Sequence, residues 1–161
     1  MLDFGKCKWT VVSMHNPMYS VGKYGADSER NAIALALREQ LQDLFAEYGV
    51  DIVLQGHDHK ISRTFPIDEN GNPQTERFEK IDGIDYSIDP SGVIYVMNGP
   101  AGNQARDPFS VDNALFSYAQ SSKAASWAEL SFDGDTLTVT VKYHDGVGEK
   151  VYYTWGIKKT S

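Results

Sequence analysis

The chain has 161 residues, of which 41% are hydrophobic and 23% charged, so it is long enough for one domain with its own core and is not predicted to be disordered. Its 22 acidic and 15 basic residues give a net charge of −7, which argues against binding to a nucleic-acid backbone or to an anionic membrane. The single cysteine, Cys7, excludes an intrachain disulfide, and no apolar run of about 18 residues predicts a membrane span.

The first third of the chain predicts a βαβ unit. Residues 9–14 form an apolar, β-branched run typical of a strand, and Pro17 closes it. Over residues 29–48 apolar side chains recur at helical spacing, and Gly49 can end that helix. The apolar residues that recur at this spacing are Ile33, Leu37, Leu41, Leu44, Phe45 and Tyr48. A second, buried strand is predicted over residues 50–55, and a right-handed crossover makes the two strands parallel and adjacent.

The rest of the chain predicts β-structure. Residues 66–73 carry turn-forming residues and indicate a surface excursion or hairpin tip, and residues 92–98 indicate another strand. The last third alternates apolar and polar residues, which predicts a closing antiparallel meander. Its expected strands lie around residues 128–132, 136–143 and 151–155.

The most informative motif is Gly56-His57-Asp58-His59, which follows the second predicted strand directly. In open α/β sheets, ligands gather outside the carboxyl ends of the strands. In extended backbone the side chains of His57 and His59 leave on the same side, about 6.5 to 7 Å apart at the backbone, while Asp58 points away. His15 follows the first strand, so the parallel pairing brings it to the same edge. Three imidazoles are therefore expected to meet at one rim of the sheet.

This arrangement of imidazoles favours a metal site. Metal–nitrogen bonds are about 2.0 to 2.1 Å long and paired catalytic metals lie about 3.5 to 4 Å apart, so His15, His57 and His59 are predicted metal ligands. Three neutral imidazoles cannot offset the charge of two divalent cations, and the chain shows no well-placed carboxylate ligand. We expect Asp58 to orient a neighbour or cap a turn, and His144 to lie on the surface. The site is therefore expected to be incomplete, with its acidic ligands encoded elsewhere.

Two stretches carry a resemblance to a known family. They are residues 11–19 and residues 48–59, and Arg63-Thr64 follows the second stretch. They resemble the calcineurin-like metallophosphoesterases, especially the purple acid phosphatase branch. The resemblance implies an α/β fold, the C-terminal half of a four-layer α/β-β/α sandwich in which one βαβ unit is followed by mixed and antiparallel strands. Residues 1–161 would be the C-terminal part of the domain, with 8–103 half of the catalytic core and 104–161 the closing strands.

The same resemblance implies a phosphoric ester hydrolase, either a phosphatase or a phosphodiesterase. Two metal ions, drawn from Fe, Zn and Mn, would activate a water against a phosphate ester. His15 and His57 would hold one ion and His59 the other, and Tyr19 and Tyr24 would contact the substrate. The family's earlier motifs, an initial Asp, Gly-Asp-x-x-Tyr and Gly-Asn-His, are absent from this chain. The chain alone is therefore expected to be inactive or nearly so, and no residue is assigned as the leaving-group acid.

Two other hypotheses remain open at this point. In the first, the chain is a non-catalytic α/β binding module that engages a protein or glycan partner. In the second, a missing N-terminal half or a second chain completes the metal site in trans. The second hypothesis follows because an unfinished sheet leaves edges that invite pairing. The chain is expected to be soluble, and an extracytoplasmic location of a longer parent protein is open, since any export signal would precede Met1.

Overall fold

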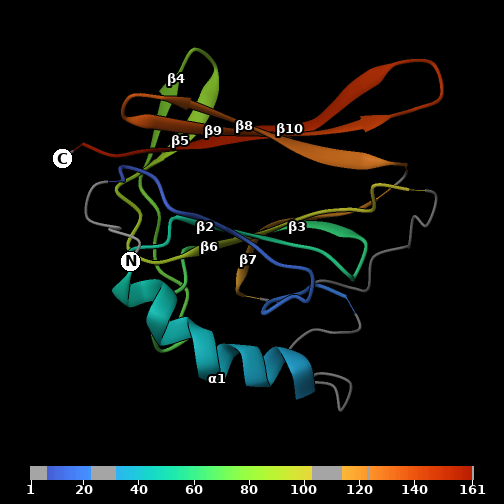
Figure 1. The fold of residues 1–161 in the computed structure, drawn as a ribbon. Coiled ribbons are helices and arrows are strands. Elements are labelled where there is room, and N and C mark those ends of the chain that lie inside the picture. Colours follow the sequence, from blue (N-terminus) through green and yellow to red (C-terminus); the bar gives the residue numbers. More distant parts are fainter. Residues whose placement is uncertain (1–6, 23–31, 103–113, 123, 161) are drawn as a thin grey trace.

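The computed structural model describes residues 7–22, 32–102, 114–122 and 124–160, which form one helix and two five-stranded sheets in three layers (Figure 1). In chain order the elements are β1 (Val11–Ser13), α1 (Ala32–Glu47), β2 (Ile52–Gln55), β3 (Lys60–Thr64), β4 (Phe78–Ile81), β5 (Ile84–Ile88), β6 (Ile94–Asn98), β7 (Phe116–Ser121), β8 (Ser126–Asp133), β9 (Thr136–His144) and β10 (Glu149–Lys158). The α/β class is confirmed. A further layer outside the second sheet, as the four-layer expectation has it, is not seen in these ranges.

Sheet 1 has the strand order β1-β2-β6-β3-β7 and contains the predicted βαβ unit. β1 and β2 are parallel neighbours, with Val11 opposite Ile52, and β6 lies parallel to β2 on its other side. The prediction of a parallel, adjacent pair is therefore confirmed. The carboxyl ends of three parallel strands meet at one edge, and β3 and β7 complete the sheet in the antiparallel sense.

Sheet 2 has the order β4-β5-β10-β9-β8 and contains the predicted closing meander. β8, β9 and β10 pair antiparallel in sequence, and β10 also pairs parallel with β5. The two sheets therefore interleave along the chain, since β4 and β5 join sheet 2 while β7 joins sheet 1. The expected division near residue 103 consequently does not coincide with a boundary between the sheets.

The core lies between the two sheets, with a second cluster beneath the helix. The first cluster consists of Ile52, Ile61, Ile94, Val96, Leu137, Val139, Val141, Trp155 and Ile157. The second consists of Met18, Tyr19, Val50, Val53, Ile67, Val93 and Tyr95. The end of β10 returns to the start of the described chain, where the Lys159 Nζ donates to the Lys8 carbonyl at 2.5 Å and lies 4.7 Å from the Trp9 ring centroid.

The helix packs with a narrower face than its sequence predicts. Leu37, Leu41 and Phe45 pack against the second cluster. Three other apolar residues of the same spacing stay exposed: Ile33, Leu44 and Tyr48 are 59%, 43% and 49% exposed. The expected helix start falls outside the described residues, whereas Gly49 ends the helix with φ at 61°, as predicted. Within the described ranges, no helical segment combines the length and the apolar composition that a bilayer span requires.

A buried tyrosine under the helix gives a pH-dependent prediction. Tyr95 is fully buried, and its hydroxyl has no hydrogen-bond partner among the described residues. Burial raises the pKa of Tyr95 far above the ordinary tyrosine value. Below pH of about 10 both folded and unfolded chains keep this phenol neutral, whereas above it only the unfolded chain ionises, so stability falls as pH rises.

We expect Tyr95→Phe to raise the free energy of unfolding by about 1 kcal/mol at neutral pH, since it removes an unpaired buried hydroxyl. The variant should also lose stability less steeply than the parent above pH of about 10. Urea unfolding at several pH values measures both effects. Equal slopes in the parent and the variant would contradict the assignment.

Candidate metal site

The loops after β1 and β2 are joined by one side chain at the carboxyl edge of sheet 1. The buried Gln55, the last residue of β2, accepts from the backbone N–H groups of Met18 at 2.6 Å and Tyr19 at 3.1 Å. Its amide also donates to the Tyr19 carbonyl at 3.0 Å. The Gly56 N–H donates to the His15 carbonyl at 3.1 Å. The histidine-bearing loop after β1 is thus held against the end of β2.

Two of the predicted ligands lie together at this edge. The His15 Nε2 and the His57 Nδ1 are 3.2 Å apart, and the two rings meet edge to face with centroids 5.2 Å apart. Two nitrogens bound to one ion at about 2.0 to 2.1 Å, with an angle of about 90 to 110° between them, lie about 3 to 3.4 Å from each other. The observed separation therefore fits two ligands of one metal ion.

The backbone of the histidine motif differs from the extended form expected above, and that expectation is wrong. His57 and His59 have φ angles of 70° and 52°, in the left-handed region that side-chain-bearing residues rarely adopt. The Asp58 N–H donates to the Gly56 carbonyl at 2.9 Å, which closes a three-residue turn around His57 of the rare, strained kind. Strain of this sort costs about 1 to 3 kcal/mol per residue and gathers at functional sites. The turn, rather than a strand, aims His57 at His15.

Asp58 anchors the strained turn from inside. Its side chain is buried and accepts a hydrogen bond from the Ser20 hydroxyl. The Ser20 Oγ in turn accepts from the Gly22 N–H at 3.0 Å. A Cβ on Gly22 would overlap the Asp58 carboxylate, so only glycine leaves room for it. Asp58 thus orients its neighbours, as expected, and belongs to the support of the site.

The other predicted site residues are placed differently. No group of three or more His, Cys, Asp or Glu side chains that could hold a metal occurs in the described ranges, so His59 is not brought into a cluster with His15 and His57 there. Tyr19 is buried, and its hydroxyl donates to the Gln42 side chain under α1. Tyr24 lies outside the described residues. His144 is exposed, as predicted, and accepts from the Gly146 N–H at 3.0 Å.

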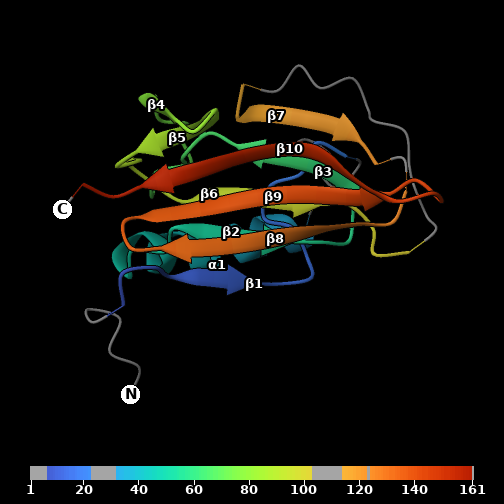
Figure 2. The same ribbon diagram turned by 90° about the horizontal axis from the view of Figure 1, so that it is seen from above.

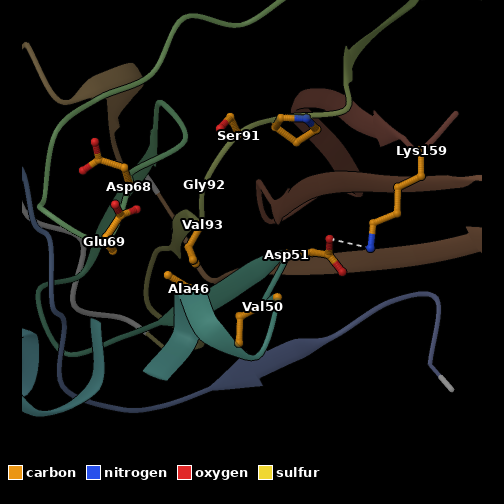
Figure 3. Close-up of a pocket in the computed structure, with 11 residues that line it drawn as sticks. Ala46, Val50, Asp51, Asp68, Glu69, Ser91, Gly92, Val93 and Lys159 are labelled. Carbon is orange, nitrogen blue, oxygen red and sulfur yellow. Dashed lines mark ion pairs between the residues drawn. The ribbon is translucent and has the colours of Figure 1, made fainter. Parts of the chain in front are cut away.

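A hollow of about 310 Å³ lies at the opposite edge of sheet 1 (Figure 3). Asp51 and Val93, which precede β2 and β6, line it together with Asp68 and Glu69. The Asp51 carboxylate forms an ion pair with Lys159 at 2.8 Å on one wall. Because ligands of open α/β sheets bind at the carboxyl ends of the strands, the histidine edge is the stronger candidate for chemistry.

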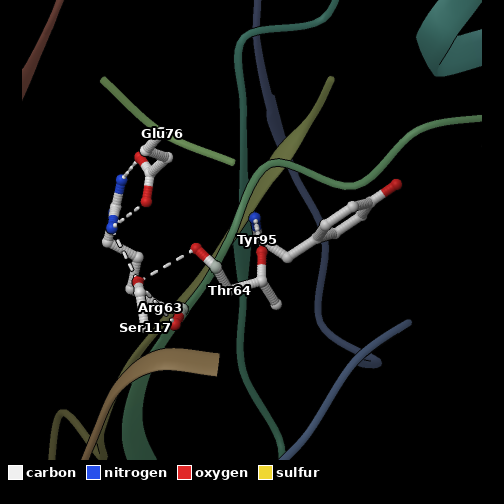
Figure 4. A network of polar contacts seen from close by, with 5 residues as sticks. All are labelled: Arg63, Thr64, Glu76, Tyr95 and Ser117. Carbon is white, nitrogen blue, oxygen red and sulfur yellow. Dashed lines mark hydrogen bonds and ion pairs between the residues drawn. The ribbon is translucent and has the colours of Figure 1, made fainter. Parts of the chain in front are cut away.

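A buried ion pair supports the strand that follows the histidine motif (Figure 4). The Arg63 guanidinium of β3 binds both carboxylate oxygens of Glu76 and donates to the Ser117 hydroxyl at 2.6 Å. The side chains of Arg63 and Glu76 are only 5% and 1% exposed. Beside them, the Tyr95 N–H donates to the Thr64 hydroxyl at 3.0 Å. Sequence reasoning did not identify this network, because Glu76 and Ser117 lie far from Arg63 in the chain.

Comparison with known proteins shows which sequences and folds the chain resembles. No family model matches the chain. The chain is 27% identical to an acid phosphatase of Aspergillus ficuum, over 94% of this chain and 26% of the relative. It is 32% identical to acid phosphatase type 7 of Homo sapiens, over 64% and 24%, and 29% identical to purple acid phosphatase 15 of Arabidopsis thaliana, over 70% and 17%. The chain thus spans about a quarter or less of the length of these relatives.

Solved structures agree on the fold. The purple acid phosphatase PPD1 from yellow lupin (Lupinus luteus) seeds matches with a TM-score of 0.70 at 23% identity, over 98% of this chain and 26% of that one. GAP50, the anchor in the inner membrane complex of Plasmodium, matches with a TM-score of 0.64 at 14% identity, over 96% and 38%. The chain is thus similar in sequence to part of the acid phosphatases and shares the fold of part of a purple acid phosphatase. More narrowly, it is homologous to part of the purple acid phosphatases, as the motifs around His15 and His57 predicted.

Proposed function

We propose that the chain is the C-terminal portion of a metal-dependent phosphoric ester hydrolase, in which His15 and His57 hold one metal ion. The observation that carries this proposal is the 3.2 Å approach of two imidazole nitrogens at the carboxyl edge of a parallel sheet. One of them sits on a strained turn, and such strain persists where function requires it. Homology to acid phosphatases supplies the reaction class.

The residues of this chain act by holding and orienting. Neutral imidazoles of His15 and His57 would each present a nitrogen lone pair to Fe, Zn or Mn, and His59 would serve the second ion of the pair. Gln55 and Asp58 fix the two loops so that the ligands keep their spacing. When bound, the metal polarises phosphate oxygens and lowers the pKa of an attacking water. It also supplies the positive charge that the acidic chain lacks.

The proposed site needs more than this chain. The imidazoles are neutral donors and cannot offset the charge of two metal ions, and no third ligand joins them in the described ranges, so we infer that carboxylates from the rest of the parent protein or from a second chain complete the site. The relatives have about three quarters or more of their length beyond the matched part. We therefore expect the isolated chain to hydrolyse phosphate esters weakly or not at all.

Metal binding tests the two ligands directly. We expect calorimetry with Zn²⁺ or Mn²⁺ to show binding to the parent chain that falls at least about tenfold in His57→Ala and in His15→Ala, since each removes one of two observed nitrogens. His144→Ala is the matched control, because that imidazole is exposed and remote from the pair, and it should bind as the parent does. An equal loss of metal affinity in all three variants would contradict the assignment of His15 and His57 as metal ligands.

An assay for hydrolysis tests incompleteness. The chain is incubated with a chromogenic phosphate monoester or diester in the presence of Mn²⁺, Zn²⁺ or Fe. Turnover comparable with that of a full-length acid phosphatase would refute the claim that ligands are missing. Turnover lost in His57→Ala would still support the metal ligands.

A non-catalytic binding module is the second candidate function. It is favoured by the fold shared with GAP50, which is described as the anchor in the inner membrane complex of Plasmodium, and by the convergence of only two histidines among the described residues. In that case the β-meander would bind a protein or glycan. Partner binding that is indifferent to His15→Ala and His57→Ala, together with no metal binding, would favour the module.

A further inference from the structure

The side chain of Asn98 carries a buried oxygen that no described residue binds. Asn98 is the last residue of β6 and lies at the edge of sheet 1 that carries the histidine loops. Its backbone carbonyl accepts from the Ser126 hydroxyl at 2.7 Å, whereas its Oδ1 has no hydrogen-bond partner among the described residues. Nearly all buried polar groups of native proteins are hydrogen-bonded, so this oxygen requires an explanation.

Three neighbouring strands place His15, Gly56 and Asn98 in one row at this edge. β1, β2 and β6 lie side by side in sheet 1 (Figure 2). Gln55 of β2 lies opposite Met97 of β6. The residues that follow them, Gly56 and Asn98, are therefore neighbours across the same two strands. On the other side of β2, the Gly56 N–H donates to the His15 carbonyl at 3.1 Å. Gly56 thus separates His15 from Asn98.

The side chains of this row belong to the face of sheet 1 that packs on sheet 2. Asn98 lies opposite Ile61 of β3, which is part of the core between the sheets, and opposite residues of an antiparallel pair share a face. Val11 of β1 packs against the same core, and His15 follows it by an even number of residues. A Cβ on Gly56 would lie 3.6 Å from the His15 Nδ1. The His15 ring therefore leans over Gly56, toward the strand that carries Asn98.

The two ring nitrogens of His15 have separate tasks. Its Nε2 lies 3.2 Å from the His57 Nδ1 and is the nitrogen that would bind the metal. A neutral imidazole with a lone pair on Nε2 carries its proton on Nδ1. Histidines that bind metals almost always donate this other N–H to a carboxylate, a carbonyl or a water, which fixes the tautomer and the ring orientation. The Asn98 Oδ1 is an acceptor of this kind, on the side to which the His15 Nδ1 is turned.

We propose that Asn98 is a positioning residue of the metal site, whose Oδ1 accepts from the His15 Nδ1–H across Gly56, directly or through one water. The inference rests on the proposed function, because it assigns the His15 Nε2 to the metal. It also explains the glycine at position 56. Gly56 does not have a positive φ, and a methyl group there would lie 3.4 Å from the His15 carbonyl oxygen, an ordinary contact. The glycine therefore keeps a path open between donor and acceptor.

The position of the His15 proton tests the proposal without metal. Nitrogen-15 spectra at a pH where the imidazoles are neutral show which ring nitrogen is protonated, and His15→Ala assigns the signals. We expect the proton on Nδ1 in the parent and a shift toward Nε2 in Asn98→Leu, because leucine resembles asparagine in shape and cannot accept. Gly56→Ala should cause the same shift, since its methyl group stands between the two side chains. Asn98→Asp retains an acceptor and should keep the parent's tautomer.

Calorimetry with Zn²⁺ links the tautomer to the site. We expect the affinity to fall at least about tenfold in Asn98→Leu and in Gly56→Ala, and Asn98→Asp to retain it. Ser87→Ala is the matched control and should bind as the parent does. The Ser87 hydroxyl is also buried without a partner among the described residues, but it lies in sheet 2. Urea unfolding checks that each variant is folded.

Two results would overturn the proposal. They are an unchanged His15 tautomer in Asn98→Leu and a loss of Zn²⁺ affinity in Ser87→Ala as large as that in Asn98→Leu. The proposed function fails by a different result, Zn²⁺ binding that His15→Ala and His57→Ala leave unchanged. Because the tautomer is measured without metal, it decides the role of Asn98 in either case.

Discussion

Arg63→Ala is expected to lower the free energy of unfolding by about 3 to 5 kcal/mol, because it leaves the Glu76 carboxylate buried without its partner. The guanidinium also stacks 4.1 Å from the Trp155 ring centroid, so the substitution removes packing between the two sheets as well. Urea unfolding measures the loss. Since β3 follows the histidine motif directly, metal binding should weaken together with stability.

Two controls separate charge from packing. The double variant Arg63→Met with Glu76→Leu removes both charges and should recover most of the loss, since apolar replacement of a buried ion pair is often neutral. Lys80→Ala breaks the exposed ion pair between Lys80 and Asp85 and should stay within about 1 kcal/mol of the parent. A double variant as unstable as Arg63→Ala would show that shape, not charge, dominates at this position.

Gly22→Ala is the second substitution with a large expected effect. The added methyl group would overlap the Asp58 carboxylate and break its contact with Ser20, at a cost of about 1 to 3 kcal/mol. Because Asp58 anchors the strained turn, the His57 ring should no longer be held in its orientation toward His15. Metal affinity should therefore fall about 10- to 100-fold. Calorimetry measures the affinity and urea unfolding the stability.

Gly148→Ala is the matched control for that experiment. A methyl group at Gly148 meets nothing within 4 Å, and Gly148 lies in the exposed turn between β9 and β10. We expect it to change stability by less than about 0.5 kcal/mol and metal affinity not at all. Unchanged metal binding in Gly22→Ala would mean that Asp58 does not position the histidines.

Much of the topology follows from sequence patterns. The β1-α1-β2 unit and the meander were predictable because helical and strand periodicities extend over whole elements there. β3 was not, since Lys60, Ser62 and Arg63 are polar yet buried, and their partners come from remote segments. β4 carries exposed charged residues in a short strand, which also hides its pattern. A buried strand with polar residues can be recognised in a sequence only once the partners of those residues are known.

The candidate site shows the same division. The parallel pairing of β1 and β2 was enough to predict that His15 lies at the edge that carries His57, independently of the backbone conformation of the histidine motif. The left-handed turn was not predictable, because it depends on Asp58 reaching Ser20 past Gly22. Sequence patterns report periodic burial, whereas such a turn depends on one contact between two loops. A polar residue at the end of a buried strand, here Gln55, was the available signal for that contact.

The place of β10 has a consequence for synthesis in the cell. It is the central strand of sheet 2, flanked by β5 and β9, and it is made after every other strand of the structure. A nascent chain therefore cannot seal the space between the sheets until Trp155 and Ile157 have left the ribosome. Until then the apolar faces of β9 and β6 remain exposed to solvent and prone to aggregation. We therefore expect this protein to depend on chaperones during translation more than its size suggests.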